Sequence, residues 1–362
     1  MEFNYSNMSL SMQELYQTQE AEKDGRLVDE VVASAPLLNY LDSRTIPGIS
    51  IECWRRKAVP FFGPRPIGYG AKNLKGFYEK VPASLFHFDG KLEVDAALLE
   101  VEKNQGGLSP ASLVARTAKD IMDGGMKLLD LNLLYGSKLG AGFGLGLHQV
   151  IAPFMTVSAN SEYAKFDASS ESVRKSKEYL AACADNTGSS VYFICKKNAA
   201  LEVLWGNGKG IRRGRLRDVE VDGETVDGIV GTFEGKVQHF SAWVGLFPRN
   251  QFAIGRMKNI TAETGISDAA IIEAKSLIFD ELDMEVTAIV MNKSVRSMLQ
   301  KNRANVQAVH GLGSATLYAA TPTEVDGIPI LVDNNIQMDE SDEALAKLGR
   351  KQLAEAKGRA TF

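Results

Sequence analysis

The sequence has few of the residues that build metal sites and disulfide frameworks. Its 362 residues include three cysteines and four histidines. Cys53, Cys183 and Cys195 are odd in number and widely spaced, so they fit neither a disulfide framework nor a cysteine metal site and suit a reducing compartment. No histidine stands near a cysteine or a carboxylate at metal-ligand spacing. We therefore expect no metal ion.

The sequence also lacks an apolar run long enough to cross a bilayer. Residues 139–155 fall short of the ~20 apolar residues that are needed, and they contain His148, Gln149 and Pro153. The first 26 residues have no basic segment followed by an apolar one, so we expect no signal peptide. The formal net charge of −4 argues against a protein that coats nucleic acid by its overall charge. The expectation is a soluble protein that is synthesised inside the cell and has no membrane contact.

No pattern for catalysis or for a cofactor is complete. The alternating glycines of residues 140–146 follow a predicted helix rather than a strand, and Pro153 comes where a helix would be needed, so a nucleotide site is a weak interpretation. Close backbone packing is the stronger one. Ser314 lies in GLGSA, which is not the nucleophile-elbow pattern. Asp333 is followed by Asn334 without the regular ligand spacing of a calcium loop, which favours a turn. We expect no catalytic residue and no cofactor.

Aromatic and basic side chains are concentrated between residues 46 and 95. The prolines in this stretch exclude a helix and interrupt any central strand, so a long hairpin is predicted. A two-stranded ribbon is marginally stable by itself and gains stability by packing against another surface. The residues predicted to form a subunit interface are Trp54, Phe61, Phe62, Tyr69, Phe77 and Tyr78.

The rest of the chain divides into helical and α/β parts. Residues 8–42 read as a helical arm with too few apolar residues for a core of its own. A long helix begins near Pro110, because apolar residues recur at i, i+4, i+7 and i+8, and it ends at Gly136 after a glycine pair that favours a bend. Strand and helix patterns then follow, up to a short strand at residues 323–336. A charged helical tail comes last.

This order of elements resembles the major capsid protein of tailed bacteriophages, which has the α+β, Hong Kong 97-like fold. Residues 111–140, ASLVARTAKDIMDGGMKLLDLNLLYGSKLG, look like the spine helix of that family. The hairpin from Ile51 to roughly Val94 matches the extended loop that reaches over a neighbouring subunit. Residues 320–336, ATPTEVDGIPILVDNNI, are similar to the Gly-Ile-Pro-aliphatic strand with which many such proteins return to the peripheral domain.

The resemblance implies six parts of the chain. They are an N-terminal arm (1–50), an extended loop (51–95), a peripheral domain with the spine helix (96–155), an axial domain (156–320), a return strand to the peripheral domain (321–340) and a C-terminal tail helix (341–362).

The resemblance also implies a function. The chain would self-assemble as hexamers and pentamers into the icosahedral head shell that encloses phage DNA, and it would not be an enzyme. Its implied partners are copies of itself, a separate scaffolding protein, portal and decoration proteins, and packaged DNA. The DNA contact would be non-specific, through the loop from Lys209 to Arg217 and the basic tail. The protein would be synthesised and assembled in the host bacterial cytoplasm and would end in the virion.

Two alternatives stay open at the level of sequence. An encapsulin, a cellular cargo-holding shell, has the same fold but no portal or DNA, and the long N-terminal arm makes it the weaker choice. The other is a soluble α/β enzyme that binds a nucleotide cofactor at the Gly-rich passage. A nucleotide or flavin that stays bound to the purified protein would favour the enzyme.

Overall fold

The structure is a computed structural model of the chain. It describes residues 35–58, 62–67, 69–71, 73–97, 100, 110–148, 165–167, 188–206, 210–224, 230–249, 253–262, 265–279, 285–309 and 320–356. Most of the predicted N-terminal arm therefore lies outside the described residues, as do Lys209, His310, Ser314 and the last residues of the tail.

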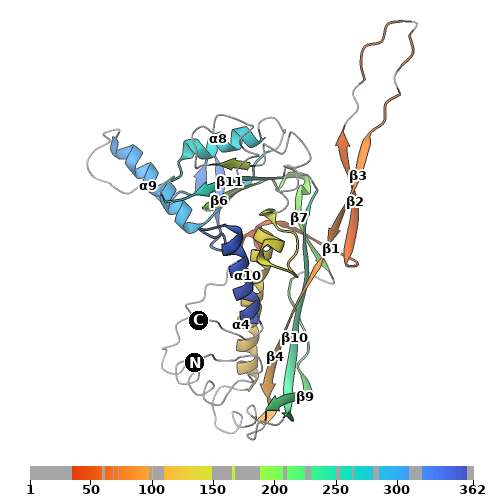
Figure 1. Ribbon diagram of the computed structural model, residues 1–362, viewed down its shortest axis with the longest axis vertical. Helices are drawn as coiled ribbons and strands as arrows, with labels where there is room; N and C mark the ends of the chain where they lie inside the picture. The colour runs from red at the N-terminus through yellow and green to blue at the C-terminus, as the bar shows by residue number, and fades with distance from the viewer. Residues whose placement is uncertain are drawn as a thin grey trace.

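A long helix, α4 (Pro110–Tyr135), lies along two long strands of the first sheet (Figure 1). The strand order of this sheet is β1-β7-β10-β4, and β8 and β9 pair with other parts of β10. The strand β10 is continuous over 19 residues. The strands of this sheet are β1 (Asp42–Ile46), β4 (Phe86–Asp95), β7 (Leu201–Gly206), β8 (Arg212–Arg213), β9 (Arg217–Glu224) and β10 (Val230–Pro248).

Alternation along β4 and β10 explains how this sheet meets α4. Leu92 and Val94 of β4 and Phe240 of β10 are buried and pack against Val114 and Ala118, which lie one helical turn apart on α4. The side chains between them on β4 point to the opposite face of the sheet and are more exposed. The continuous helix shows that the glycine pair at 124–125 does not interrupt α4.

A second sheet has the strand order β13-β14-β12-β6-β11-β5. It is covered on one face by the helices α8 (Asp268–Phe279) and α9 (Lys293–Val309), which lie at the upper left of Figure 1. The strands of this sheet are β5 (Lys165–Asp167), β6 (Ser189–Ile194), β11 (Ile254–Ile260), β12 (Ala288–Met291), β13 (Glu324–Val325) and β14 (Ile328–Val332).

The central strand β6 is buried on both faces, and its residues alternate between two cores. Val191 and Phe193 pack in the core that contains α8 and α9. Tyr192 and Ile194 pack in the core that contains α4. Every residue of β6 is buried, and its last four residues, Val191–Ile194, are apolar without alternation, which is typical of a sheet covered on both faces.

Short elements at both ends of the described chain complete the core around α4. The helix α2 (Pro36–Tyr40) contributes Leu37, and α10 (Asp342–Ala356) contributes Leu345, both of them 0% exposed. The α4 helix ends at Tyr135, and the 3-10 turn η1 (Gly136–Leu139) follows it, beginning at a positive φ of 51° that suits glycine. A second 3-10 turn, η4 (Lys197–Ala199), joins β6 to β7.

Two predicted boundaries differ from the sheet pairing. The strand β14 pairs in parallel with β12, and β12 belongs to the segment predicted as axial. The strand β14 therefore does not join the sheet that lies along α4. The strand β10, also predicted as axial, pairs with β4 in the sheet beside α4. Both differences arise because strand pairing joins residues far apart in the sequence, which local patterns do not encode. Residues 42–46 form β1, which begins where the predicted helical arm ends and pairs in parallel with β7.

The turn before β14 agrees with its sequence. Asp326 and Gly327 have φ angles of 52° and 71°, which the Asp-Gly pair adopts readily. Pro329 lies opposite Glu324 of β13, which is two residues long, so β14 is one short strand away from the sheet edge.

Candidate assembly surfaces

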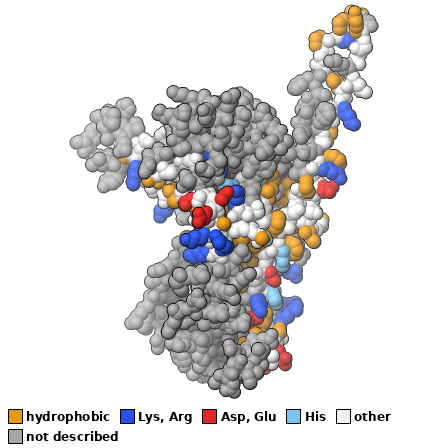
Figure 2. Space-filling view, viewed as in Figure 1, with side chains coloured by type: hydrophobic (Ala, Val, Ile, Leu, Met, Phe, Trp, Pro, Cys, Tyr) orange, Lys and Arg blue, Asp and Glu red, His pale blue; other side chains and the backbone are white. Residues whose placement is uncertain are grey.

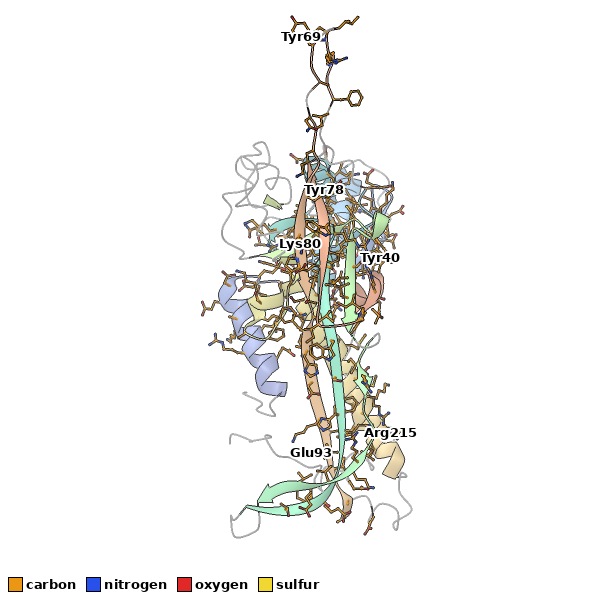
Figure 3. All side chains as sticks on the ribbon, turned by 90° about the vertical axis from the view of Figure 1, so that its right-hand side faces the viewer. Tyr40, Tyr69, Tyr78, Lys80, Glu93 and Arg215 are labelled. Atoms are coloured by element: carbon orange, nitrogen blue, oxygen red, sulfur yellow. The ribbon has the colours of Figure 1, made fainter. Side chains whose placement is uncertain are left out.

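A hairpin extends far beyond the rest of the described chain. Its strands β2 (Ser50–Ala58) and β3 (Phe77–Ser84) pair with each other in a two-stranded sheet. Figures 1 and 3 show this hairpin projecting along the long axis of the molecule. At its base the amide of Leu85 donates a hydrogen bond of 2.8 Å to the carbonyl of Ile49. Leu85 is buried with Ala83, Ile46 and Phe247, which anchors the hairpin to the body.

The outer part of the hairpin is apolar and exposed. The exposed fraction is 91% for Phe62, 100% for Ile67 and 70% for Tyr69 at the tip, and 67% for Trp54 and 62% for Tyr78 on the strands. Figure 2 shows hydrophobic side chains gathered at the tip, with basic side chains among them. Several large apolar side chains exposed on one element are uncommon on a soluble monomer and indicate a site of interaction.

The predicted interface residues therefore fall into two groups. Trp54, Phe62, Tyr69 and Tyr78 are exposed on the hairpin, as their proposed role requires. Phe61 lies outside the described residues, and so does the side chain of Phe77, although its backbone begins β3. Contact of these residues with another subunit stays a prediction.

Sequence analysis did not select all of the exposed apolar residues. Ile67 and Leu74 belong to the same surface. Their sequence signal is that each is an aliphatic residue near glycines in a segment with no local apolar partner, although neither is aromatic.

One pair of charges stabilises the hairpin locally. The ammonium of Lys80 lies 2.9 Å from the carboxylate of Glu52 on the facing strand, and 5.2 Å from the centre of the Trp54 ring. The hydrogen bond and the positive charge of Lys80 lower the pKa of Glu52. Both charged side chains are more than half exposed, so this pair contributes little to folding. It fixes how Trp54 is presented to solvent.

The opposite end of the molecule carries a second, acidic ribbon made by β9 and the start of β10. Glu220 of β9 lies directly opposite Glu234 of β10, and both are exposed. One step nearer the body, Asp218 lies opposite Lys236, and their charged groups are 2.7 Å apart. Successive even-numbered residues share one face of the ribbon, so this face holds several carboxylates and one ammonium.

Four exposed arginines lie beside the base of this ribbon. Arg212 and Arg213 form β8, which pairs with Ser241 and Phe240 of β10. Arg215 and Arg217 follow, and Figure 3 shows Arg215 on the side of the molecule away from α10. Lys209, which the sequence groups with them, lies outside the described residues.

A buried polar network connects α4, the second sheet and the start of α10. Glu340 accepts hydrogen bonds from Arg256 and Ser190, and a further one of 2.8 Å from the hydroxyl of Tyr135. Arg256 and Glu340 are both 0% exposed, and the field of Glu340 raises the pKa of Arg256 although burial opposes it. Burial first, and then the charge of Glu340, raises the pKa of Tyr135. Arg256 therefore stays charged and Tyr135 stays neutral.

Two carboxyl groups form a second buried contact between α4 and the end of β14. Asp130 accepts hydrogen bonds from the amide of Leu38 at 2.9 Å and from the side chain of Asn335 at 2.7 Å. Asp333 accepts one from the amide of Asn335 at 2.9 Å, which makes the predicted turn. Burial, then the charge of Asp130 and a hydrogen bond with it, raises the pKa of Asp333 to about 8. The carboxyl group of Asp333 therefore favours its protonated form at neutral pH in the folded protein.

Two of the four alternating glycines, Gly144 and Gly146, are closely packed, whereas nothing lies within 4 Å of the Cβ positions of Gly140 and Gly142. A Cβ on Gly146 would lie 2.4 Å from the backbone nitrogen of Gly136, and one on Gly144 would lie 2.4 Å from the ring of Phe86. The amide of Gly144 donates a buried hydrogen bond of 2.8 Å to Asn132 of α4.

Among the described residues, no group of three or more His, Cys, Asp or Glu side chains is placed to hold a metal ion. None of the described helices is both long enough and apolar enough to cross a membrane.

Comparison with known proteins gives similarity at the level of structure. No model of a known protein family matches the sequence, and no curated protein matches it. The cryo-electron microscopy structure of bacteriophage Epsilon15 aligns with a TM-score of 0.62 and 18% identity, over 93% of this chain and 98% of that one. The bacteriophage JBD30 capsid aligns at 0.45 and 10%, over 87% and 98%. The native GTA particle capsid aligns at 0.40 and 11%, over 65% and 93%.

The Epsilon15 alignment spans nearly the whole of both chains. The chain therefore has the α+β fold of a tailed-phage major capsid protein, and the Hong Kong 97-like fold predicted from the sequence is confirmed.

Proposed function

We propose that this chain is the structural subunit of a phage head shell, which assembles from many copies of itself and encloses DNA. One observation carries the proposal. The chain has a capsid fold along almost its whole length and presents an exposed apolar hairpin far from its own core. In a monomer this hairpin is a liability, whereas in a shell each hairpin lies on a neighbour and modest contacts multiply over identical copies.

The arrangement in the shell follows from the same proposal. Copies form hexamers and pentamers, and a separate scaffolding protein, portal and decoration proteins complete the particle. The subunit is synthesised and assembled in the host bacterial cytoplasm and becomes part of the virion. In this role it does no chemistry and needs no cofactor or metal. The six-part division of the chain stays part of the proposal, with β10 beside α4 and β14 in the second sheet.

Packaged DNA is the proposed contents of the shell. Two sets of exposed basic residues are available for weak contact with phosphates: Arg212 to Arg217 beside β9, and Lys347 with Arg350 on α10. Contacts of this kind do not read sequence, and they weaken as salt increases. A wall that holds DNA weakly permits both packaging and release.

Light scattering together with negative-stain electron microscopy of the purified full chain tests the proposal. We expect hexamers, pentamers or closed shells, either directly or after addition of a scaffolding protein. A monodisperse monomer at micromolar concentration under both conditions would refute it. A nucleotide or flavin retained by the purified protein would favour the enzyme alternative instead.

A further inference from the structure

The helix α4 does not fill the space above the first sheet along its whole length. A groove of about 420 Å³ lies between α4 and the strands β4 and β10. Apolar residues and glycines form most of its walls: Phe88 and Gly90 of β4, Gly125 and Leu128 of α4, and Ala242 of β10. Pockets of this volume with mostly apolar walls are the ones that proteins use for binding. The groove therefore has room for an apolar occupant.

Glycines leave this groove open. On α4, Gly125 follows Val114 and Ala118 on the stripe that faces the sheet, where a larger residue would fill the space. A Cβ at Gly125 would lie 2.8 Å from Cδ1 of Ile211, so this side chain takes up a part of the space. On β4, no atom of the described residues lies within 4 Å of a Cβ built on Gly90. Protein interiors hold few gaps larger than a water molecule, so a gap of this size beside the core indicates that another group belongs there.

The helix α10 runs alongside α4 towards the groove (Figure 1). At its start, the carboxylate of Asp342 lies 2.7 Å from the ammonium of Lys138, just past the end of α4. Further along α10, Gln352 lines the groove together with residues from the middle of α4. The helix ends at Ala356, about one turn and a rise of about 6 Å beyond Gln352. The chain that follows α10 therefore starts close to the groove.

Residues 357–362, KGRATF, follow α10 in the sequence and lie outside the described residues. Six extended residues span at most about 20 Å, so this segment is long enough to turn back over the last turn of α10 and reach the groove. Gly358 favours a change of direction, because glycine readily adopts the backbone angles that end a helix. Phe362 is the one large apolar side chain of the segment.

We propose that residues 357–362 of the same chain turn back into this groove and bury the ring of Phe362 between α4 and the first sheet. A phenyl ring brings a large apolar area and no hydrogen-bonding group, which suits these walls. Lys357 and Arg359 stay at the rim in water, since a buried charge without a partner is costly. Because the linker is short, the local concentration of the ring at the groove is high.

The contact has a consequence for the fold. With the ring in place, α4 packs against the sheet on both sides of Gly125, where its own side chains leave the gap. Residues 357–362 thus brace the long helix within one subunit. This role goes beyond the proposed function and does not depend on assembly.

Thermal melting of the unassembled full chain is the first test. Phe362→Ser should lower the melting temperature by about 2 °C or more, because the apolar contact between the ring and the groove is lost. Thr361→Ser, a matched change one residue away, should leave the melting temperature unchanged. In a chain that carries Gly90→Leu, whose side chain occupies the groove itself, Phe362→Ser should have no further effect.

A disulfide between introduced cysteines tests the position of the segment independently of stability. Cys53 and Cys183 are first replaced by serine. Thr361→Cys is then combined with Gly124→Cys, which is exposed at the groove, or with Lys119→Cys, which is exposed on another face of α4. The disulfide with position 124 should form about tenfold faster or more, because the docked segment is concentrated there. Isotope-labelled chains mixed with unlabelled ones distinguish a bond within one chain from a bond between two.

Three results would overturn the contact. The first is an equal rate of disulfide formation at positions 124 and 119 together with an unchanged melting temperature for Phe362→Ser. A disulfide that joins labelled to unlabelled chains would overturn it in favour of a segment exchanged between copies. A small apolar molecule that native mass spectrometry detects on the purified chain would overturn it in favour of a bound ligand. All of these measurements use the unassembled chain, so none of the three results affects the proposed function.

Discussion

The guanidinium of Arg256 and the carboxylate of Glu340 form an ion pair from which solvent is excluded, since both side chains are 0% exposed. Arg256 comes from β11, and Glu340 lies just before α10. The hydroxyl groups of Tyr135 and Ser190 occupy further positions on Glu340. The pair therefore ties the second sheet, α4 and α10 together at a single point in the core.

Removal of one partner of this pair should be costly. Glu340→Gln leaves the Arg256 charge buried without a counter-charge, and we expect a loss of about 3–5 kcal/mol in the free energy of unfolding. Urea unfolding of the unassembled subunit measures the loss. Lys138→Met serves as the control, because the ion pair of Lys138 with Asp342 is largely solvated and should matter little.

The double variant Arg256→Met/Glu340→Leu tests whether an unpaired buried charge causes this loss of stability. With both charges removed no ion is left unpaired, so the double variant should be more stable than Glu340→Gln alone. If the double variant loses as much free energy of unfolding as the single variants Arg256→Met and Glu340→Leu lose together, the ion pair is not the cause.

The raised pKa of Asp333, which is buried beside Asp130, makes stability depend on pH. The folded pKa of Asp333, about 8, is above its unfolded value, so the folded state binds the extra proton. The contribution of this proton to the free energy of unfolding is complete below about pH 4 and is lost as pH rises through 8. The free energy of unfolding then falls by at most about 1.4 kcal/mol per pH unit, because one proton is involved. Unfolding measured at pH 5, 7 and 8.5 should show this decline.

Asp333→Asn is the matched variant for this prediction. An asparagine can accept from the amide of Asn335 with its oxygen and donate to Asp130 with its nitrogen, which imitates the protonated acid. The variant should fold and should lose stability less steeply between pH 5 and 8.5. The same steep decline in the variant would assign the pH dependence to other groups.

Gly349 lets α10 approach the end of α4. A Cβ at this position would lie 1.6 Å from the carbonyl oxygen of Leu139, which is backbone and cannot move aside easily. Gly349→Ala should therefore destabilise the subunit by about 1–3 kcal/mol or more. Gly124→Ala is the control, because nothing lies within 4 Å of its Cβ position and alanine favours a helix by about 1 kcal/mol. Thermal melting should move in opposite directions for the two variants.

Local patterns predicted the elements that are decided locally. The helix α4 follows from its apolar spacing and Gly136, and the hairpin follows from its prolines and its aromatic residues. The turn at Asp326 and Gly327 follows from its residue types. Four exposed residues could be predicted as interface residues because the sequence around them has too few apolar residues to form a core: Trp54, Phe62, Tyr69 and Tyr78.

Features that join distant segments could not be predicted in this way. Arg256 and Glu340 are 84 residues apart, and Asp130 and Asn335 are 205 apart, so neither pair leaves a local signal. Pro329 indicated a strand near a sheet edge but not which sheet. The buried Leu345 shows that the tail helix α10 belongs to the core, whereas its many charged residues suggested a separate tail.

The hairpin tip should matter for assembly and not for folding. Deletion of the tip from Phe61 to Tyr69, or the substitutions Phe62→Ser and Ile67→Ser, should leave circular dichroism and the melting temperature near wild type, because the described tip residues are exposed. Particles should disappear, since a buried aromatic anchor contributes roughly 2 kcal/mol or more to an interface. Ile272→Ser on α8, also an exposed aliphatic residue, is the control. Unfolding of the body after the tip deletion would place the hairpin in the subunit's own core.

Binding of DNA to the unassembled subunit should be electrostatic and independent of sequence. The two sets of basic residues, on β8 and on α10, lie on different sides of the molecule (Figures 1 and 3), so a single duplex meets a few cations at a time. Each phosphate contact contributes a slope of about −0.9 to log K against log salt, so binding should weaken steeply between low and physiological salt. Filter binding with unrelated DNA sequences measures both properties.

Variants of each basic set show how much it contributes to DNA binding. Two double variants each remove two exposed cations: Arg212→Gln/Arg213→Gln and Lys347→Gln/Arg350→Gln. If the removed cations contact phosphates, the slope of log K against log salt should become shallower by about one unit per contact removed. Lys293→Gln/Lys301→Gln on α9 removes two exposed cations elsewhere and serves as the matched control. Because every duplex presents the same phosphates, the loss should be equal for all sequences. Tight, salt-resistant binding to one sequence would contradict the role of a shell wall and indicate a protein that recognises nucleic acid through its bases.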